Sequence, residues 1–287
     1  MSKFFAGGLL VLLAAFSSSR AEPIKVVAAE NVYGDIARQI GGSDVTVTSI
    51  LSNPNQDPHE FEASASTARA IADARLVIYN GVGYDPWAVK LLSASKSASR
   101  EVIEVAKLAR KKAGDNPHLW YDVATISALG STLAIKMTQL DAEHRSGYTE
   151  RGVAFEAAMA PLRGRIATLR AKHADTPVTA TEPVFDYMAA ALGLKMRNSR
   201  FQLAVMNGTE PGAAAIAAFE QDLRNRAVKV LLYNTQTGQA LAEQMRTIAN
   251  EAGVPVVAIT ETMPPGQSYQ VWMLGQLDEL DRALGSR

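Results

Sequence analysis

The feature that most constrains the fold of this chain is an alternation of short apolar runs with segments of helical spacing, which occurs once in each half. Strand-like runs lie at 24–29, 45–50 and 76–80, and again at 177–181, 228–234 and 254–260. Strands separated by helices favour parallel sheets with crossover helices. The sequence therefore predicts an α/β fold with two lobes, each containing a mainly parallel sheet flanked by helices.

The stretch between the two halves is rich in helix-forming residues. Apolar residues at three- and four-residue steps predict a helix of about 25 residues over 146–172. Pro161 should kink this helix because proline removes one backbone hydrogen bond. We expect a long, rigid spine helix to join the lobes. The predicted domains are an N-terminal lobe at 22–122, a helical linker at 123–175 and a C-terminal lobe at 176–287.

The first 21 residues are typical of a cleaved signal peptide. Lys3 precedes an apolar run at 9–16, and small residues flank Arg20 before Glu22. The run is too short to span a bilayer as a helix. The sequence contains no cysteine, so we expect no lipid anchor on an N-terminal cysteine. These observations predict an exported protein that is free in the periplasm.

The charge balance argues against binding to nucleic acid. The chain has 29 acidic and 29 basic residues, and its formal net charge is zero. A phosphate-binding surface needs a broad excess of basic residues, which this sequence lacks. We expect a monomer that binds no nucleic acid.

Two of the four histidines in the chain lie in closely similar settings. His59 follows Asp57-Pro58, and His118 follows Asn116-Pro117. Proline fixes its own φ angle and restricts the residue before it, so each imidazole is expected on a stiff turn. A single histidine on a turn is often not a metal ligand, but this matched pair indicates that both histidines bind a metal.

Two carboxylates are expected beside the histidines. Glu182 follows the predicted strand at 177–181, and Glu261 follows the strand at 254–260. Ligands of open parallel sheets bind outside the carboxyl ends of the strands. Glu182 could instead cap the helix that follows it, and Glu261 could be an exposed loop acid. We predict a metal site in the cleft between the lobes, formed by His59, His118, Glu182 and Glu261.

This ligand set neutralises a divalent transition metal. Two neutral imidazoles and two carboxylates cancel a charge that would be costly to bury alone. The oxygen ligands favour Mn²⁺ over Zn²⁺, and Fe²⁺ is also compatible, although the Irving–Williams order favours Zn²⁺.

Glu60, Glu62 and Tyr187 are further candidates around this site. Glu60 and Glu62 could accept the second ring proton of a histidine ligand, or they could be exposed turn acids. Tyr187 is expected near the cleft, in contact with the ligands or their neighbours. His144 and His173 lack the proline frame and are expected to be solvated.

The histidine motifs resemble those of a known family. The run Asp-Pro-His-Glu-Phe-Glu at 57–62, the run Asn-Pro-His-Leu-Trp at 116–120 and the segment at 75–83 are similar to the zinc- and manganese-binding solute-binding proteins of bacterial ABC importers. The resemblance implies a cleft site with His59 and His118 as its first two ligands. It places Glu182 at a position that is usually His, and Glu261 at a position that is commonly Asp. The His-rich loop of many zinc-specific members is absent, which weakens a zinc-only interpretation.

The predicted function is that of a periplasmic binding protein that captures Mn²⁺ or Zn²⁺ and delivers it to an ABC permease in the inner membrane. The alternatives are an exported metal-dependent hydrolase and a metal-dependent adhesin. A hydrolase needs an open coordination position for water, whereas four ligands leave none. We therefore predict that the protein is not an enzyme.

Overall fold

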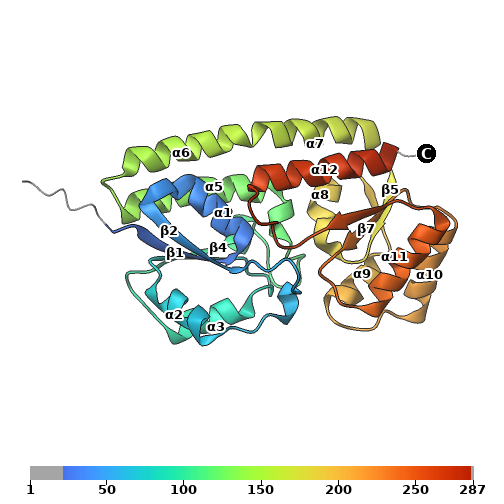
Figure 1. Cartoon of the computed structure of the whole chain (residues 1–287), viewed down its shortest axis with the longest axis horizontal. Coiled ribbons are helices and arrows are strands. Elements are labelled where there is room, and N and C mark those ends of the chain that lie inside the picture. Colours follow the sequence, from blue (N-terminus) through green and yellow to red (C-terminus); the bar gives the residue numbers. More distant parts are fainter. Residues whose placement is uncertain (1–21, 286–287) are drawn as a thin grey trace, which may run out of the picture.

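The structure is a computed structural model that describes residues 22–285, so the predicted signal peptide at 1–21 lies outside the described residues. It contains two sheets of four parallel strands, each flanked by helices (Figure 1). This confirms the predicted α/β class with two parallel-sheet lobes. Within the described part of the chain, no helix combines the length and apolar character needed to cross a membrane.

The first lobe is a sheet with the strand order β2-β1-β3-β4. Helix α1 covers one face of this sheet, and α2 and α3 cover the other (Figure 1), so the central strand β1 is buried along most of its length. The edge strand β4 was not predicted, because glutamates begin and end this short segment. The elements of this lobe are β1 (Ile24–Glu30), α1 (Asn31–Gly41), β2 (Val45–Leu51), α2 (Ala65–Asp73), β3 (Leu76–Tyr79), α3 (Pro86–Ala94), β4 (Glu101–Glu104) and α4 (Val105–Leu108).

The second lobe repeats this topology with the strand order β6-β5-β7-β8. Its edge strand β6 has only three residues, Lys-Met-Arg, and therefore carries no apolar signal in the sequence. Helices α9 and α10 were also not predicted. The elements are β5 (Pro177–Ala180), α8 (Asp186–Ala191), β6 (Lys195–Arg197), α9 (Ser199–Met206), α10 (Ala213–Arg224), β7 (Leu231–Asn234), α11 (Ala240–Ala252) and β8 (Val256–Ile259).

The middle of the chain forms the expected long helix. After α5 (Val123–Leu140), the helices α6 (Arg145–Ala158) and α7 (Ala160–His173) follow one another with a break at Met159. The break lies close to Pro161, as the missing backbone N–H of proline predicts. Helices α6 and α7 run along the top of both lobes (Figure 1). The domain boundaries at 122 and 175 stay a prediction.

The C-terminal helix α12 (Tyr269–Gly285) was not predicted, and it lies beside α7 (Figure 1). Asp281 of α12 accepts hydrogen bonds from His173 Nε2 and from Lys172 Nζ, each at 2.7 Å. His173 is buried against α12, and the expectation that it is solvated was wrong because this helix was not predicted. This contact attaches the end of the chain to the spine.

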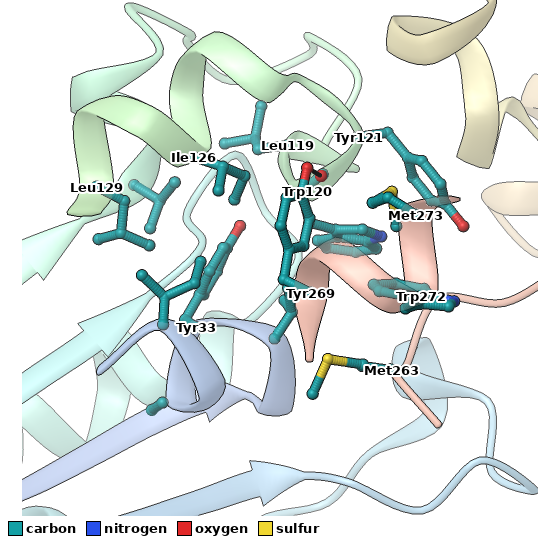
Figure 2. Packing of buried hydrophobic residues seen from close by; sticks show 14 of the residues in the cluster. Tyr33, Leu119, Trp120, Tyr121, Ile126, Leu129, Met263, Tyr269, Trp272 and Met273 are labelled. Carbon is teal, nitrogen blue, oxygen red and sulfur yellow. Dashed lines mark hydrogen bonds between the residues drawn. The ribbon is translucent and has the colours of Figure 1, made fainter. Parts of the chain in front are cut away.

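A continuous apolar core joins the two lobes. Figure 2 shows part of it, where Tyr33 of α1, Trp120 of the 3-10 turn η3 (Leu119–Tyr121) and Tyr269 of α12 are all buried. Tyr269 also donates its hydroxyl proton to the Trp120 carbonyl at 2.9 Å, and Asn31 exchanges two hydrogen bonds with the Met263 backbone. Large rotation of one lobe against the other would break these contacts, so this side of the molecule is a rigid connection.

Candidate metal centre

His59 lies on a short turn in the loop that follows β2. The turn is the 3-10 helix η2 (Pro58–Glu60), and the Asp57 carboxylate caps it by accepting a hydrogen bond from the His59 N–H at 2.9 Å. Pro58 at the first position of the turn already has the φ angle that the turn requires. The His59 side chain is 25 % exposed, so its imidazole forms the solvent-facing side of the site.

His118 is fully buried, and Asn116 fixes its orientation. Asn116 Oδ1 accepts a hydrogen bond from His118 Nδ1 at 2.7 Å, while Asn116 Nδ2 donates to the Pro183 carbonyl at 2.6 Å. Because the carbonyl of Pro183 fixes which end of the amide faces the ring, the His118 proton lies on Nδ1. The Nε2 atom is buried without a hydrogen-bond partner, and its lone pair is available for a metal. Burial also lowers the pKa of His118, which keeps the ring neutral.

Glu261 follows β8 and lies between the two imidazoles. Its Oε2 atom is 3.3 Å from His118 Nε2 and 3.5 Å from His59 Nε2. Oε2 also accepts a hydrogen bond from the Tyr84 hydroxyl at 2.9 Å, and Oε1 accepts one from Asn234 Nδ2 at 2.8 Å. Both carboxylate oxygens are therefore held in place.

The candidate ligand atoms of His59, His118 and Glu261 all lie within 4.8 Å of one another. Two of these residues come from the first half of the chain and one from the end of the second sheet. Glu182 is buried beside this group, and Asn234 Nδ2 donates to Glu182 Oε1 at 3.2 Å as well as to Glu261 Oε1. The structure thus groups three of the four predicted ligands tightly. The fourth, Glu182, contacts the Asn234 side-chain amide that also holds Glu261.

The two carboxylates differ in their protonation. Burial and the nearby charge of Glu261 raise the pKa of Glu182 to about 8. Burial also opposes ionisation of Glu261, but the contacts with the His118 and His59 rings and the hydrogen bond from the Tyr84 hydroxyl outweigh it and hold the pKa of Glu261 below its usual range. At neutral pH Glu261 is an anion and Glu182 holds a proton, because two carboxylates this close resist a second charge.

Of the three candidates expected around the ligands, only Tyr187 contacts the surroundings of the site in the part of the chain that the structure describes. Tyr187 donates its hydroxyl proton to the Asn116 carbonyl at 2.7 Å and so contacts the backbone beside His118. Glu60 and Glu62 are exposed. Among residues 22–285, neither of these carboxylates forms a hydrogen bond or ion pair with either histidine of the site. Their expected role therefore has no contact to support it here.

Three polar residues in or beside the site were missed. Tyr84 and Asn234 hold Glu261, and Gln236 bonds to the backbone of Glu261 and Thr262. Asn234 ends β7 at the same edge of the sheet as Glu182 and Glu261, so the rule that selected the two glutamates would also have found it. No sequence pattern pointed to Tyr84, because its contact with Glu261 joins segments 177 residues apart.

This arrangement suits chelation of a divalent cation. A cation near Oε2 of Glu261 would contact two neutral imidazole nitrogens and one anionic oxygen, and Glu182 would supply the second negative charge after losing its proton. A cation in this buried position is thereby neutralised, which removes most of the cost of burying it.

Proteins of known structure and curated sequence share this architecture. The metal ABC transporter substrate-binding lipoprotein SloC of Streptococcus mutans is 23 % identical over 299 residues, covering 96 % of this chain and 95 % of SloC. The periplasmic zinc-binding protein TroA of Treponema pallidum matches with a TM-score of 0.75 and 19 % identity, covering 93 % of this chain and all of TroA. FpvC of Pseudomonas aeruginosa, solved with Mn²⁺, also gives a TM-score of 0.75 at 22 % identity, covering 92 % of this chain and 98 % of FpvC.

The comparisons correct one expectation. From the absence of cysteine we expected a protein that is free in the periplasm and carries no lipid anchor. SloC and other relatives are named lipoproteins, which contradicts that location. The absence of cysteine therefore does not establish a free periplasmic location for this protein.

A protein-family model matches almost the whole described chain, in agreement with these comparisons. The model is described as ZnuA, zinc-uptake complex component A, periplasmic, and it matches residues 26–283. The match includes both sheets, the spine helix and every residue of the candidate metal centre. By the extent of this match, the chain belongs to the ZnuA family of metal-uptake components.

Proposed function

We propose that this protein is the substrate-binding component of an ABC importer and that its cargo is a divalent transition metal. The observation that carries the proposal is that candidate ligand atoms of His59, His118 and Glu261 all lie within 4.8 Å of one another. The names of SloC, TroA and FpvC, which specify metal, zinc and Mn²⁺, support the same cargo class.

We infer that His59, His118, Glu182 and Glu261 are the four ligands. His118 presents a buried Nε2 lone pair, and Glu261 is an anion held by two hydrogen bonds. Glu182 reaches the cation by breaking its shared contact with Asn234 and losing its proton. We propose that the site prefers Mn²⁺ over Zn²⁺. Its two carboxylates supply oxygen ligands, which suit Mn²⁺ better than they suit the tetrahedral coordination typical of Zn²⁺.

The partner in this proposal is a membrane permease, and the protein acts as a monomer without enzymatic turnover. Four protein ligands around one cation leave no coordination position for a reacting water, which a hydrolase requires. The rigid connection through α12 and Trp120 limits closure to a small tilt and to local loop movement.

The test is metal binding by purified protein and matched variants. We expect the wild type to bind one equivalent of Mn²⁺ or Zn²⁺ by isothermal titration and elemental analysis. H118A and E261A should lose more than about 100-fold in affinity, since each removes a ligand and not merely a neighbour of one. H144A is the control, because His144 pairs with Asp141 away from the site. Unchanged affinity in H118A would refute the proposed ligand set.

A further inference from the structure

Gln236 connects the two loops that carry His59 and Glu261. Its side chain is buried, and its Oε1 atom accepts hydrogen bonds from the backbone N–H groups of Glu261 at 2.7 Å and Thr262 at 2.9 Å. It also accepts one from the Thr262 hydroxyl at 3.2 Å. One end of the Gln236 amide is thus fixed to the backbone beside Glu261.

The other end of the amide reaches the first lobe. Gln236 Nε2 donates to the Gln56 carbonyl at 2.9 Å, across a sequence separation of 180 residues. Gln56 lies in the loop 52–57, which leads directly into the turn of His59. A single side chain therefore bonds the backbone beside Glu261 to the backbone that precedes His59.

The two histidines differ in how firmly they are held. His118 is buried, and Asn116 attaches its loop to the Pro183 carbonyl of the second lobe. The loop 52–57 is largely exposed, and among residues 22–285 its hydrogen bonding to the second lobe consists of the bond from Gln236. His59 is also the more exposed of the two rings, with 25 % of its side chain accessible against 0 % for His118. The His59 side of the site is therefore the more open to solvent.

We propose that Gln236 is a clasp that slows release of the bound metal by holding the His59 loop against the Glu261 loop. This inference rests on the proposed function and identifies a positioning residue within it. When the Gln236–Gln56 bond opens, the loop 52–57 can carry His59 away from Glu261 while His118 and its partner Asn116 stay in place. Release then begins on one side of the site, without rotation of the lobes.

Two substitutions separate the clasp from its other contacts. Q236E keeps the length of the side chain and its acceptor oxygens but removes the donor to Gln56. Q236N keeps the amide but shortens the chain, so that it cannot bond to both loops. The matched control is Q239E, because Gln239 Nε2 also donates to a backbone carbonyl, that of Val205 at 2.6 Å, within the second lobe.

The measurement is stopped-flow transfer of Zn²⁺ from loaded protein to an excess of a fluorescent chelator, together with the association rate. We expect Q236E and Q236N to release Zn²⁺ about fivefold faster, as loss of one neutral hydrogen bond predicts. Association should stay within twofold of the wild type, and Q239E should behave as the wild type. The added negative charge of Q236E would by itself hold a cation more tightly, so faster release in that variant is not an effect of charge.

The outcomes distinguish the clasp from the function on which it rests. If the wild type takes up neither Zn²⁺ nor Mn²⁺, the proposed function fails and the clasp fails with it. If the wild type binds metal but both Gln236 variants release Zn²⁺ at its rate, only the clasp is refuted. Equal acceleration in Q239E would also refute it, because the effect would then be one of general stability. Should Q236E not fold, Q236N alone decides between these results.

Discussion

Metal binding should release a proton from Glu182 near neutral pH. In the metal-free protein, burial and the charge of Glu261 raise the pKa of Glu182 to about 8. A metal binds the carboxylate and not the protonated acid, so the proton and the metal compete for this group. The metal affinity should therefore rise with pH up to about 8 and fall as the pH is lowered from there.

The magnitude follows from the pKa. With a pKa of about 8, Glu182 is about 90 % protonated at pH 7, so binding should release about 0.9 proton from this group. Between pH 7 and pH 6, its contribution should weaken metal affinity by about tenfold, or about 1.4 kcal/mol. Burial lowers the pKa of His118, so that ring should add little to the change in this range.

The assay is isothermal titration at pH 7 in two buffers of different ionisation enthalpy, which counts the protons released per metal. E182Q is the comparison variant, because the neutral amide has no proton to lose and resembles the protonated acid in shape. We expect the wild type to release about 0.9 proton more than E182Q. Equal proton release by the two proteins would show that Glu182 either does not ligate the metal or is already ionised.

Three further substitutions test the surroundings of the site. N234A should weaken metal binding by about 10- to 100-fold, because Asn234 holds both Glu182 and Glu261; titration of this variant with no loss of affinity would contradict its role. Y84F should lower the free energy of unfolding of the metal-free protein by about 1.5–3 kcal/mol in urea denaturation, since it removes a hydrogen bond to an ionised carboxylate. H173A should cost about 1–3 kcal/mol of stability but leave metal affinity unchanged, because His173 bonds to Asp281 away from the site; a change in affinity would mean that the spine influences the cleft.

The central strands of both sheets and the edge strands β2 and β8 could be predicted from sequence, whereas the edge strands β4 and β6 could not. The strands β1 and β3 are buried apolar runs, and such runs are visible in any sequence. The edge strands β4 and β6 contain charged residues because one side of each faces solvent, so their composition does not differ from that of a loop. Helix α12 was not predicted, although its buried residues Tyr269, Trp272, Met273, Leu277 and Leu280 lie on one face at helical spacing.

The candidate ligands could be proposed from sequence because each lies at a position with a physical signature. His59 and His118 follow prolines, and Glu182 and Glu261 follow strands at the edge where ligands bind. The groups that fix these ligands were not visible in the same way. Gln236 bonds to Gln56 across 180 residues, and only the folded chain brings such distant amides together.

The position of α12 has a consequence for how the protein reaches its binding-competent form. This helix consists of the last residues of the described chain, yet the Tyr269 N–H donates to the Asp35 carboxylate and the Tyr269 hydroxyl donates to the Trp120 carbonyl, both in the first half. Contacts between residues so distant in sequence close the largest loops of the chain, and they form slowly for that reason. A nascent chain that has folded both sheets but not yet docked α12 should therefore lack a completed cleft, and the ability to take up metal should appear only once this helix has docked.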